Sequence, residues 1–237
     1  MLQFNSVVIL CIYSLRWFME LSTSLKEENN RKASFWDKFG VPILLLLATL
    51  LAYGTVCHKL GFFLDDWYII LFQQKFGPNG FWIFFSQDRP LEALPFLIFF
   101  SIFKDSALAW ALFALVMRWV LSLVFWITLN KLFPKQRKLW IWASLIFTIY
   151  PGFKFHNFSI MFALFYVFFT FYILSFYSMG RAIEKRQSPW VYGLWTLLGI
   201  VCLGIGIMPV EYFFGLEFIR PILLWIIHAR SYPKQRE

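Results

Sequence analysis

The sequence predicts an all-α polytopic membrane protein, and two observations on composition lead to that fold class. Hydrophobic residues make up 60% of the 237 residues, charged residues only 15%, and Phe alone occurs 31 times. Apolar runs recur along almost the whole chain, which water-soluble domains rarely show. The net charge of +9 does not indicate nucleic acid as a partner, because the basic residues lie between apolar runs, where they act as topology signals.

The N-terminal segment, residues 1–39, is expected to be cytoplasmic. Its short apolar run from Val7 to Tyr13 has no Lys or Arg before it and is too short to span a bilayer. An interfacial helix and a misassigned start both stay open for residues 1–20. Residues 22–38 are polar and charged, as expected of a linker.

Residues 40–229 are predicted to form a transmembrane module of about six helices, followed by a cytoplasmic basic tail at 230–237. The six apolar runs cover residues 40–57, 106–129, 139–150, 158–179, 189–208 and 212–228. A further run from Leu91 to Phe103 covers only about 20 Å at 1.5 Å per residue, against about 30 Å of hydrocarbon. We therefore expect this run to be a re-entrant or juxtamembrane helix.

The first external loop, residues 58–105, is predicted to carry short helices at the membrane interface. Trp67–Phe76 and Phe81–Phe85 are apolar stretches too short to cross a bilayer, and the cluster Gly77-Pro78-Asn79-Gly80 between them is a turn signal. Together with Leu91–Phe103, these stretches are expected to lie outside the six-helix bundle.

The distribution of Lys and Arg orients the module. With six spans, 15 of the 22 basic residues lie in segments on one side and 5 on the other. The positive-inside rule makes the richer side cytoplasmic, together with both termini. A crossing by Leu91–Phe103 would export the basic runs at 131–138 and 181–187 and remove this bias. Any chemistry is therefore expected on the external face, where these polar groups would lie: Asp65, Asp66, Asp88, Arg89, Lys154, His156 and Glu211.

The adjacent acids Asp65 and Asp66 follow the first span and precede Trp67. A carboxylate at this place can act as a general base or bind a metal ion. The alternative is a pair of exposed loop acids without a role in chemistry.

Arg89 stands directly before Pro90, which is well placed in a first helical turn. An arginine at a helix start can bind a phosphate together with the helix dipole. In the alternative interpretation, Pro90 only starts a helix and Asp88 only caps it.

Lys154 and His156 follow the run from Leu139 to Tyr150, whose 12 residues reach about 18 Å. The chain would then break below the outer headgroups, where irregular backbone is tolerated only beside protein or a wet cavity. Both side chains would line that cavity; alternatively, Lys154 reaches the outer headgroups.

Three ionisable residues fall inside predicted spans. Glu217 and Arg220 are three residues apart on one helix face and can pair, either as part of a cavity or as a purely structural pair. Arg118 lies at the middle of its span, where an unpaired arginine costs about 2.5–3.5 kcal/mol. It therefore needs a partner, and its depth favours a role in holding the bundle together.

Four short motifs, in this order and with this charge bias, resemble the GT-C superfamily of membrane glycosyltransferases. They are LDDW at 64–67, DRPLE at 88–92, YPGF at 150–153 and VEYFFGLEFIRP at 210–221. The last two look like an uncharacterised bacterial branch of that superfamily.

The resemblance implies transfer of a sugar from a polyprenyl-phosphate carrier to an acceptor at the external face of the bacterial cytoplasmic membrane. Asp65 or Asp66 would be the catalytic base. Three basic residues would bind the donor phosphate: Arg89, Lys154 and Arg220. Four residues would bind the sugar or the acceptor: Trp67, His156, Glu211 and Glu217. Some members need a divalent cation and others do not, which stays open here.

Members of this superfamily are usually longer, so this chain could be an N-terminal module that a second membrane subunit completes.

Two other functions stay open. A transporter or lipid-carrier flippase could use Arg118 with the Glu217 and Arg220 pair as a polar path, although the sequence shows no internal repeat. A non-catalytic membrane subunit would bind a partner through its spans.

Overall fold

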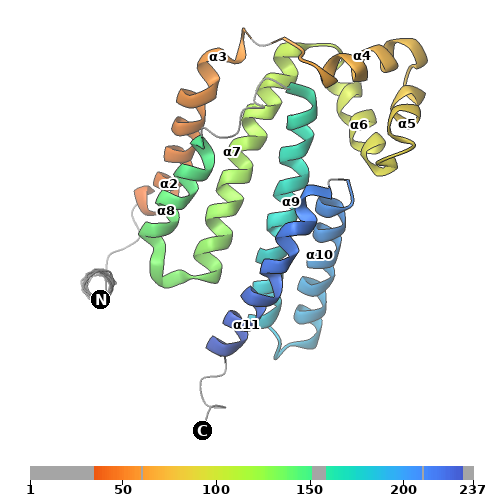
Figure 1. Cartoon of the computed structure of the whole chain (residues 1–237). Coiled ribbons are helices and arrows are strands. Elements are labelled where there is room, and N and C mark those ends of the chain that lie inside the picture. Colours follow the sequence, from red (N-terminus) through yellow and green to blue (C-terminus); the bar gives the residue numbers. More distant parts are fainter. Residues whose placement is uncertain (1–34, 60, 151–158, 210, 232–237) are drawn as a thin grey trace, which may run out of the picture. The chain divides into compact units, whose positions relative to one another are not determined.

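The computed structural model describes residues 35–59, 61–150, 159–209 and 211–231. The chain divides into two units, residues 1–41 and 42–237, and each is described by itself. In unit 1 the described residues form the beginning of helix α2, Phe35–Thr49. Every regular element of the described ranges is helical, as predicted (Figure 1).

In unit 2, α2 continues through the π-helical turn η1 (Leu50–Gly54) into α3 (Thr55–Cys57). Three short helices follow: α4 (Asp65–Phe76), α5 (Asn79–Phe85) and, after the 3₁₀ turn η2 (Pro90–Glu92), α6 (Ala93–Phe103). The bundle then contains α7 (Ala107–Leu132), the 3₁₀ turn η3 (Pro134–Gln136), α8 (Arg137–Ile149) and α9 (Ser159–Glu184). It ends with α10 (Pro189–Ile207), the 3₁₀ helix η4 (Glu211–Phe218) and α11 (Ile219–Ser231).

Four helical segments in the described ranges are long and apolar enough to cross a membrane. They are Phe39–Cys57, Ala107–Leu132, Ile160–Glu184 and Pro189–Ile207. They match four of the six predicted spans and support a membrane-embedded protein. The other two predicted spans fall on α8 and α11, which have 13 residues each and are shorter than the roughly 20 residues of an ordinary span. Helix length alone therefore does not establish six crossings.

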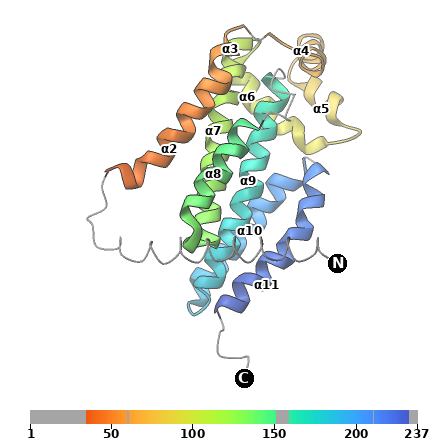
Figure 2. The ribbon, with the colours of Figure 1, turned by 60° about the vertical axis from the view of Figure 1, so that its left-hand side comes forward.

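The two longest helices, α7 and α9, run side by side in the same direction (Figures 1 and 2). Arg118 of α7 bonds Tyr166 of α9, and near the ends of the same helices Lys131 Nζ lies 2.6 Å from Glu184 Oε2. Helix α8 packs against α7, and α10 packs against α9. Between α7 and α9 in the sequence, α8 runs in the opposite direction (Figure 1).

Small residues bring α10 close to α9. Gly199, Cys202 and Gly206 are buried on one side of α10, and a Cβ atom on Gly206 would lie 2.6 Å from the backbone nitrogen of Tyr172. Such close approach through small side chains is typical of helix pairs in membranes. The opposite side of α10 is open, with Leu194 65% exposed, as expected of a surface that faces lipid.

An aromatic core holds the three short helices against one end of the bundle. Phe81 of α5 packs on Phe96 and Phe100 of α6, and Phe100 lies 5.0 Å from the ring of Trp110 in α7. The fully buried Trp110 donates a hydrogen bond from Nε1 to the carbonyl of Lys104 (2.9 Å). We call this end, where α4, α5 and α6 lie, the α4 end of the bundle.

Candidate functional site

The two adjacent acids at the start of α4 have different surroundings. Asp66 is fully buried, whereas Asp65 is exposed. Asp66 Oδ1 accepts hydrogen bonds from the backbone N–H groups of Ile160 (3.2 Å) and Met161 (3.1 Å), and Oδ2 accepts one from Phe63 (3.4 Å). The sequence did not decide which of the two acids would be the catalytic base, and in the structure the two differ in burial.

Asp66 caps helix α9 from another element. The first N–H groups of an α-helix have no partner within the helix, and the helix dipole places partial positive charge there. The buried Asp66 carboxylate accepts hydrogen bonds from two of these N–H groups, and its negative charge is attracted by the partial positive charge of the helix start. Asp66 therefore fixes α4 to the beginning of α9.

Arg118 caps the C-terminal end of α8, as Asp66 caps the N-terminal end of α9. Its Nε and one terminal nitrogen donate to the carbonyl of Thr148 at 3.0 and 2.8 Å, in the last turn of α8. Its guanidinium also donates to the hydroxyls of Tyr166 (2.8 Å) and Tyr53 (2.6 Å). A cation is favoured at a helix C-terminus, and in hydrocarbon an unpartnered carbonyl would cost several kcal/mol. Among the described residues, the partners that the sequence required for Arg118 include a backbone carbonyl and the hydroxyls of two tyrosines.

The helix ends that these two buried charges bind stand just before and just after residues 151–158 in the sequence. Arg118 binds the last turn before this segment, and Asp66 binds the first turn after it. Lys154 and His156, two of the predicted site residues, belong to this segment and lie outside the described residues.

Arg89 connects the α4 end with the second half of the chain. Its guanidinium lies 3.7 Å from the carboxylate of Glu92, which is buried, and 5.8 Å from the ring centroid of Tyr212 in η4. Pro90 opens the 3₁₀ turn η2, as predicted, and Asp88 is exposed. The buried carboxylate and the aromatic ring together give the partly exposed guanidinium a defined position.

Glu217 and Arg220 form the pair that their spacing predicted. Arg220 donates two hydrogen bonds to the Glu217 carboxylate (2.6 and 2.8 Å) and one to Ser175 Oγ (2.8 Å), and it lies 4.1 Å from the ring centroid of Phe176. Ser175 is 14 residues beyond Met161, which is about 21 Å along α9. The structure therefore does not bring Arg220 together with the acids of α4.

Two further predicted site residues, Trp67 and Glu211, lie in α4 and η4. Trp67 is exposed on α4, next to the buried Asp66. Glu211 begins η4, and its side chain lies outside the described residues. Within the part of the chain that the structure describes, no group of three or more His, Cys, Asp or Glu side chains is arranged to hold a metal ion.

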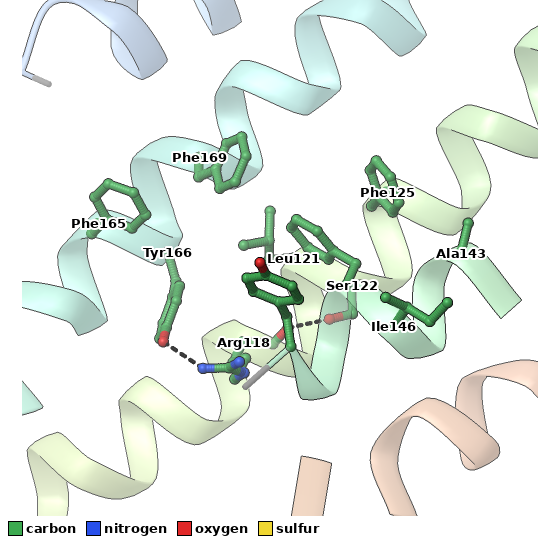
Figure 3. A pocket seen from close by; sticks show the side chains of 11 residues that line it. Arg118, Leu121, Ser122, Phe125, Ala143, Ile146, Phe165, Tyr166 and Phe169 are labelled. Carbon is green, nitrogen blue, oxygen red and sulfur yellow. Dashed lines mark hydrogen bonds between the residues drawn. The ribbon is translucent and has the colours of Figure 1, made fainter. Parts of the chain in front are cut away.

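A groove lies between α8 and α9, with α7 as its floor (Figure 3). Its volume is about 380 Å³, and most of its lining is aromatic or aliphatic. Arg118 and Tyr166 lie at its border and are joined by a hydrogen bond. The groove is thus separate from the acids of α4.

Two kinds of residue at these sites were not predicted from the sequence. Glu92 follows Arg89 by three residues, which is a suitable spacing for an ion pair. Its burial could not be predicted, because a glutamate beside an apolar run is usually exposed. Tyr53 and Tyr166 lie in different predicted spans, and only the packing of the bundle brings both to Arg118.

Comparison of this chain with protein-family models, with curated proteins and with solved structures finds no match.

Proposed function

We propose that this chain is a membrane glycosyltransferase, or one module of such an enzyme, that moves a sugar from a polyprenyl-phosphate donor to an acceptor on the external face. The proposal rests on the difference between the two acids of α4. Asp66 is held by the start of α9, so the helical turn that carries Asp65 is fixed while the side chain of Asp65 stays exposed. An exposed carboxylate on a rigid turn suits a general base.

Six crossings are the topology that best supports this function. Parallel α7 and α9 require a return across the membrane, which α8 begins. At about 2.0 Å per residue in a 3₁₀ helix and 1.5 Å in an α-helix, η4 and α11 together extend about 35 Å, enough for the last crossing. The basic residues between α7 and α8, and between α9 and α10, make that end cytoplasmic, so the α4 end is external and both termini are cytoplasmic.

The proposed reaction uses two groups of the α4 end. Asp65 accepts the proton of an acceptor hydroxyl, whose oxygen forms a bond to the anomeric carbon of the donor sugar. The bond between that carbon and the phosphate oxygen breaks, and polyprenyl phosphate leaves with the electron pair. Arg89 stabilises the negative charge on the leaving phosphate by charge-assisted hydrogen bonds. Asp65 then releases its proton to water.

Among the predicted donor-binding residues, Arg89 is better placed for this role than Arg220. Arg89 is partly exposed at the α4 end, where Asp65 begins α4. Arg220 makes a bidentate bond to Glu217 and lies about 21 Å along α9 from the Asp66 cap. We assign Arg220 to holding α11 on α9.

The test is release of polyprenyl phosphate by the purified protein in liposomes that contain polyprenyl-phosphate sugars. Release to water needs no acceptor, and each sugar of a donor panel is assayed separately, with and without a chelator of divalent cations. We expect Asp65→Asn to lower the rate by about 10²–10⁴-fold, as loss of a general base does. Asp105→Asn is the matched control, because Asp105 is also an exposed acid, just before α7. Equal rates for wild type and Asp65→Asn would refute the assignment.

A non-catalytic membrane subunit is the second candidate. It is favoured because Asp66, Arg118 and Arg220 all serve contacts between helices, and because one side of α10 is open. This function predicts stable co-purification with another membrane protein. It also predicts that the assembled complex is equally active with the wild-type chain and with the Asp65→Asn variant. A catalytic role of Asp65 predicts the opposite, a lower rate for Asp65→Asn.

A further inference from the structure

The groove between α8 and α9 has the chemistry of a site for hydrocarbon. Phe125 of α7, Phe147 of α8 and Phe169 of α9 line it, and Ala143 of α8 is its smallest lining residue. Phe125, Ala143 and Phe169 are labelled in Figure 3. The polar groups at its border are already used by the protein. Ser122 Oγ donates to the carbonyl of Arg118 (2.9 Å), and Arg118 binds Thr148 and Tyr166. The groove thus offers contacts to an apolar chain rather than to a headgroup.

The depth of the groove agrees with this chemistry. Arg118 lies 11 residues from the first residue of α7 and 14 from the last, which is about 17 and 21 Å. The groove is therefore near the middle of α7, one of the two longest helices of the bundle. A lipid with its headgroup at either surface reaches this level only with its hydrocarbon chain.

The groove is continuous with the surface that faces lipid. Ile146 and Tyr150 line it and are still 60% and 56% exposed, so its open side lies on the outside of the bundle. In a membrane, this side of the groove faces the hydrocarbon chains of the surrounding lipid. The volume of about 380 Å³ is near the lower end of ligand pockets, which suits one chain and not a whole lipid.

We propose that this groove binds one acyl chain of a membrane phospholipid. A polyprenyl carrier is much longer than an acyl chain and would leave most of its length outside the groove. The bound chain covers the aromatic walls and keeps water away from the hydrogen bonds of Arg118, which strengthens them. This inference does not depend on the proposed glycosyltransferase activity.

The first experiment counts retained lipid by native mass spectrometry. Protein is taken from vesicles of palmitoyl–oleoyl phosphatidylcholine, with polyprenyl phosphate added in equal amount, into a mild detergent. We expect one phosphatidylcholine to stay on each wild-type chain and about tenfold less on Ala143→Trp, because the indole fills the groove. Ala52→Trp is the matched control, since Ala52 is exposed and outside the groove. Equal retention in both variants, or retention of polyprenyl phosphate instead, would overturn the proposal.

The second experiment needs no variant and decides the question if Ala143→Trp does not fold. Wild-type protein binds phosphatidylcholine that carries a diazirine on one acyl chain, free lipid is removed, and the sample is irradiated. We expect labelled peptides to contain Phe125, Phe147 or Phe169, which line the groove from its three helices. Label found only on open faces such as that of α10 would contradict an acyl chain in the groove.

Discussion

Replacing Asp66 by alanine should destabilise the protein far more than replacing its neighbour Asp65. Two N–H groups, those of Ile160 and Met161, lose their acceptor in a place where the Asp66 side chain is fully buried. Leaving a buried donor without a partner costs about 1–3 kcal/mol. The lost attraction between the carboxylate and the helix dipole adds about 0.3–1 kcal/mol. Because these contributions overlap, we expect Asp66→Ala to lower the free energy of unfolding by about 2–4 kcal/mol.

Asp66→Asn gives an intermediate test, because the amide keeps one oxygen acceptor but loses the charge. Its expected cost is about 1–2 kcal/mol, since a hydrogen bond to a charged group is worth more than one to a neutral group. Asp65→Ala is the control on the same helical turn. Its side chain is exposed, so its effect should stay within about 0.5 kcal/mol.

Unfolding in mixed micelles, titrated with a denaturing detergent, measures these differences. Amide hydrogen exchange provides the local readout, because the first turn of α9 should lose protection before its middle does. The reasoning would be refuted if Asp66→Ala were as stable as Asp65→Ala. It would also be refuted if exchange rose equally along the whole of α9, because the carboxylate would then not act as a cap.

Two further changes test the packing of the bundle. Arg118→Ala should cost about 2–4 kcal/mol and raise hydrogen exchange in the last turn of α8, because Thr148 loses two charged donors; an unchanged melting temperature in detergent would contradict this. Gly206→Ala should cost about 1–3 kcal/mol, since its Cβ would lie 2.6 Å from the nitrogen of Tyr172. Gly204→Ala, where nothing lies within 4 Å of the Cβ, should leave the melting temperature unchanged or raise it, and equal effects of the two alanines would be evidence against the tight contact.

Hydrophobic pattern predicted the helices well. The turn at Gly77 separates α4 from α5, with Gly77 at a φ of +62°. The predicted run Leu91–Phe103 lies in the helical stretch Pro90–Phe103, which is too short to cross. Periodicity and length are local properties, so a single sequence is enough to recognise them. The number of crossings is not local in this sense, because α8 and α11 are short and their role depends on the helices beside them.

The candidate site was only partly accessible to sequence reasoning. The pair of Glu217 and Arg220 was predicted from their spacing of three residues, and it joins the end of η4 to the start of α11. The different surroundings of Asp65 and Asp66 could not be predicted, because the partners of Asp66 are 94 and 95 residues away in the sequence. The partners of Asp66 are also backbone N–H groups, which almost every residue has, so no sequence motif indicates them. The partner of Arg118 at Thr148 is likewise a backbone carbonyl, which the residue type does not reveal.

The long separation between Asp66 and its partners has a consequence for biosynthesis. The contact of Arg118 with Thr148 closes over 30 residues and can form as soon as α8 has been made. The contact of Asp66 with Ile160 closes over 94 residues and has to wait until α9 is made. Until then the carboxylate stays hydrated, and α4 lacks its anchor on α9. A ribosome stalled before residue 160 would therefore leave a nascent chain whose α4 region is open to proteases, and resumed synthesis of α9 would close it.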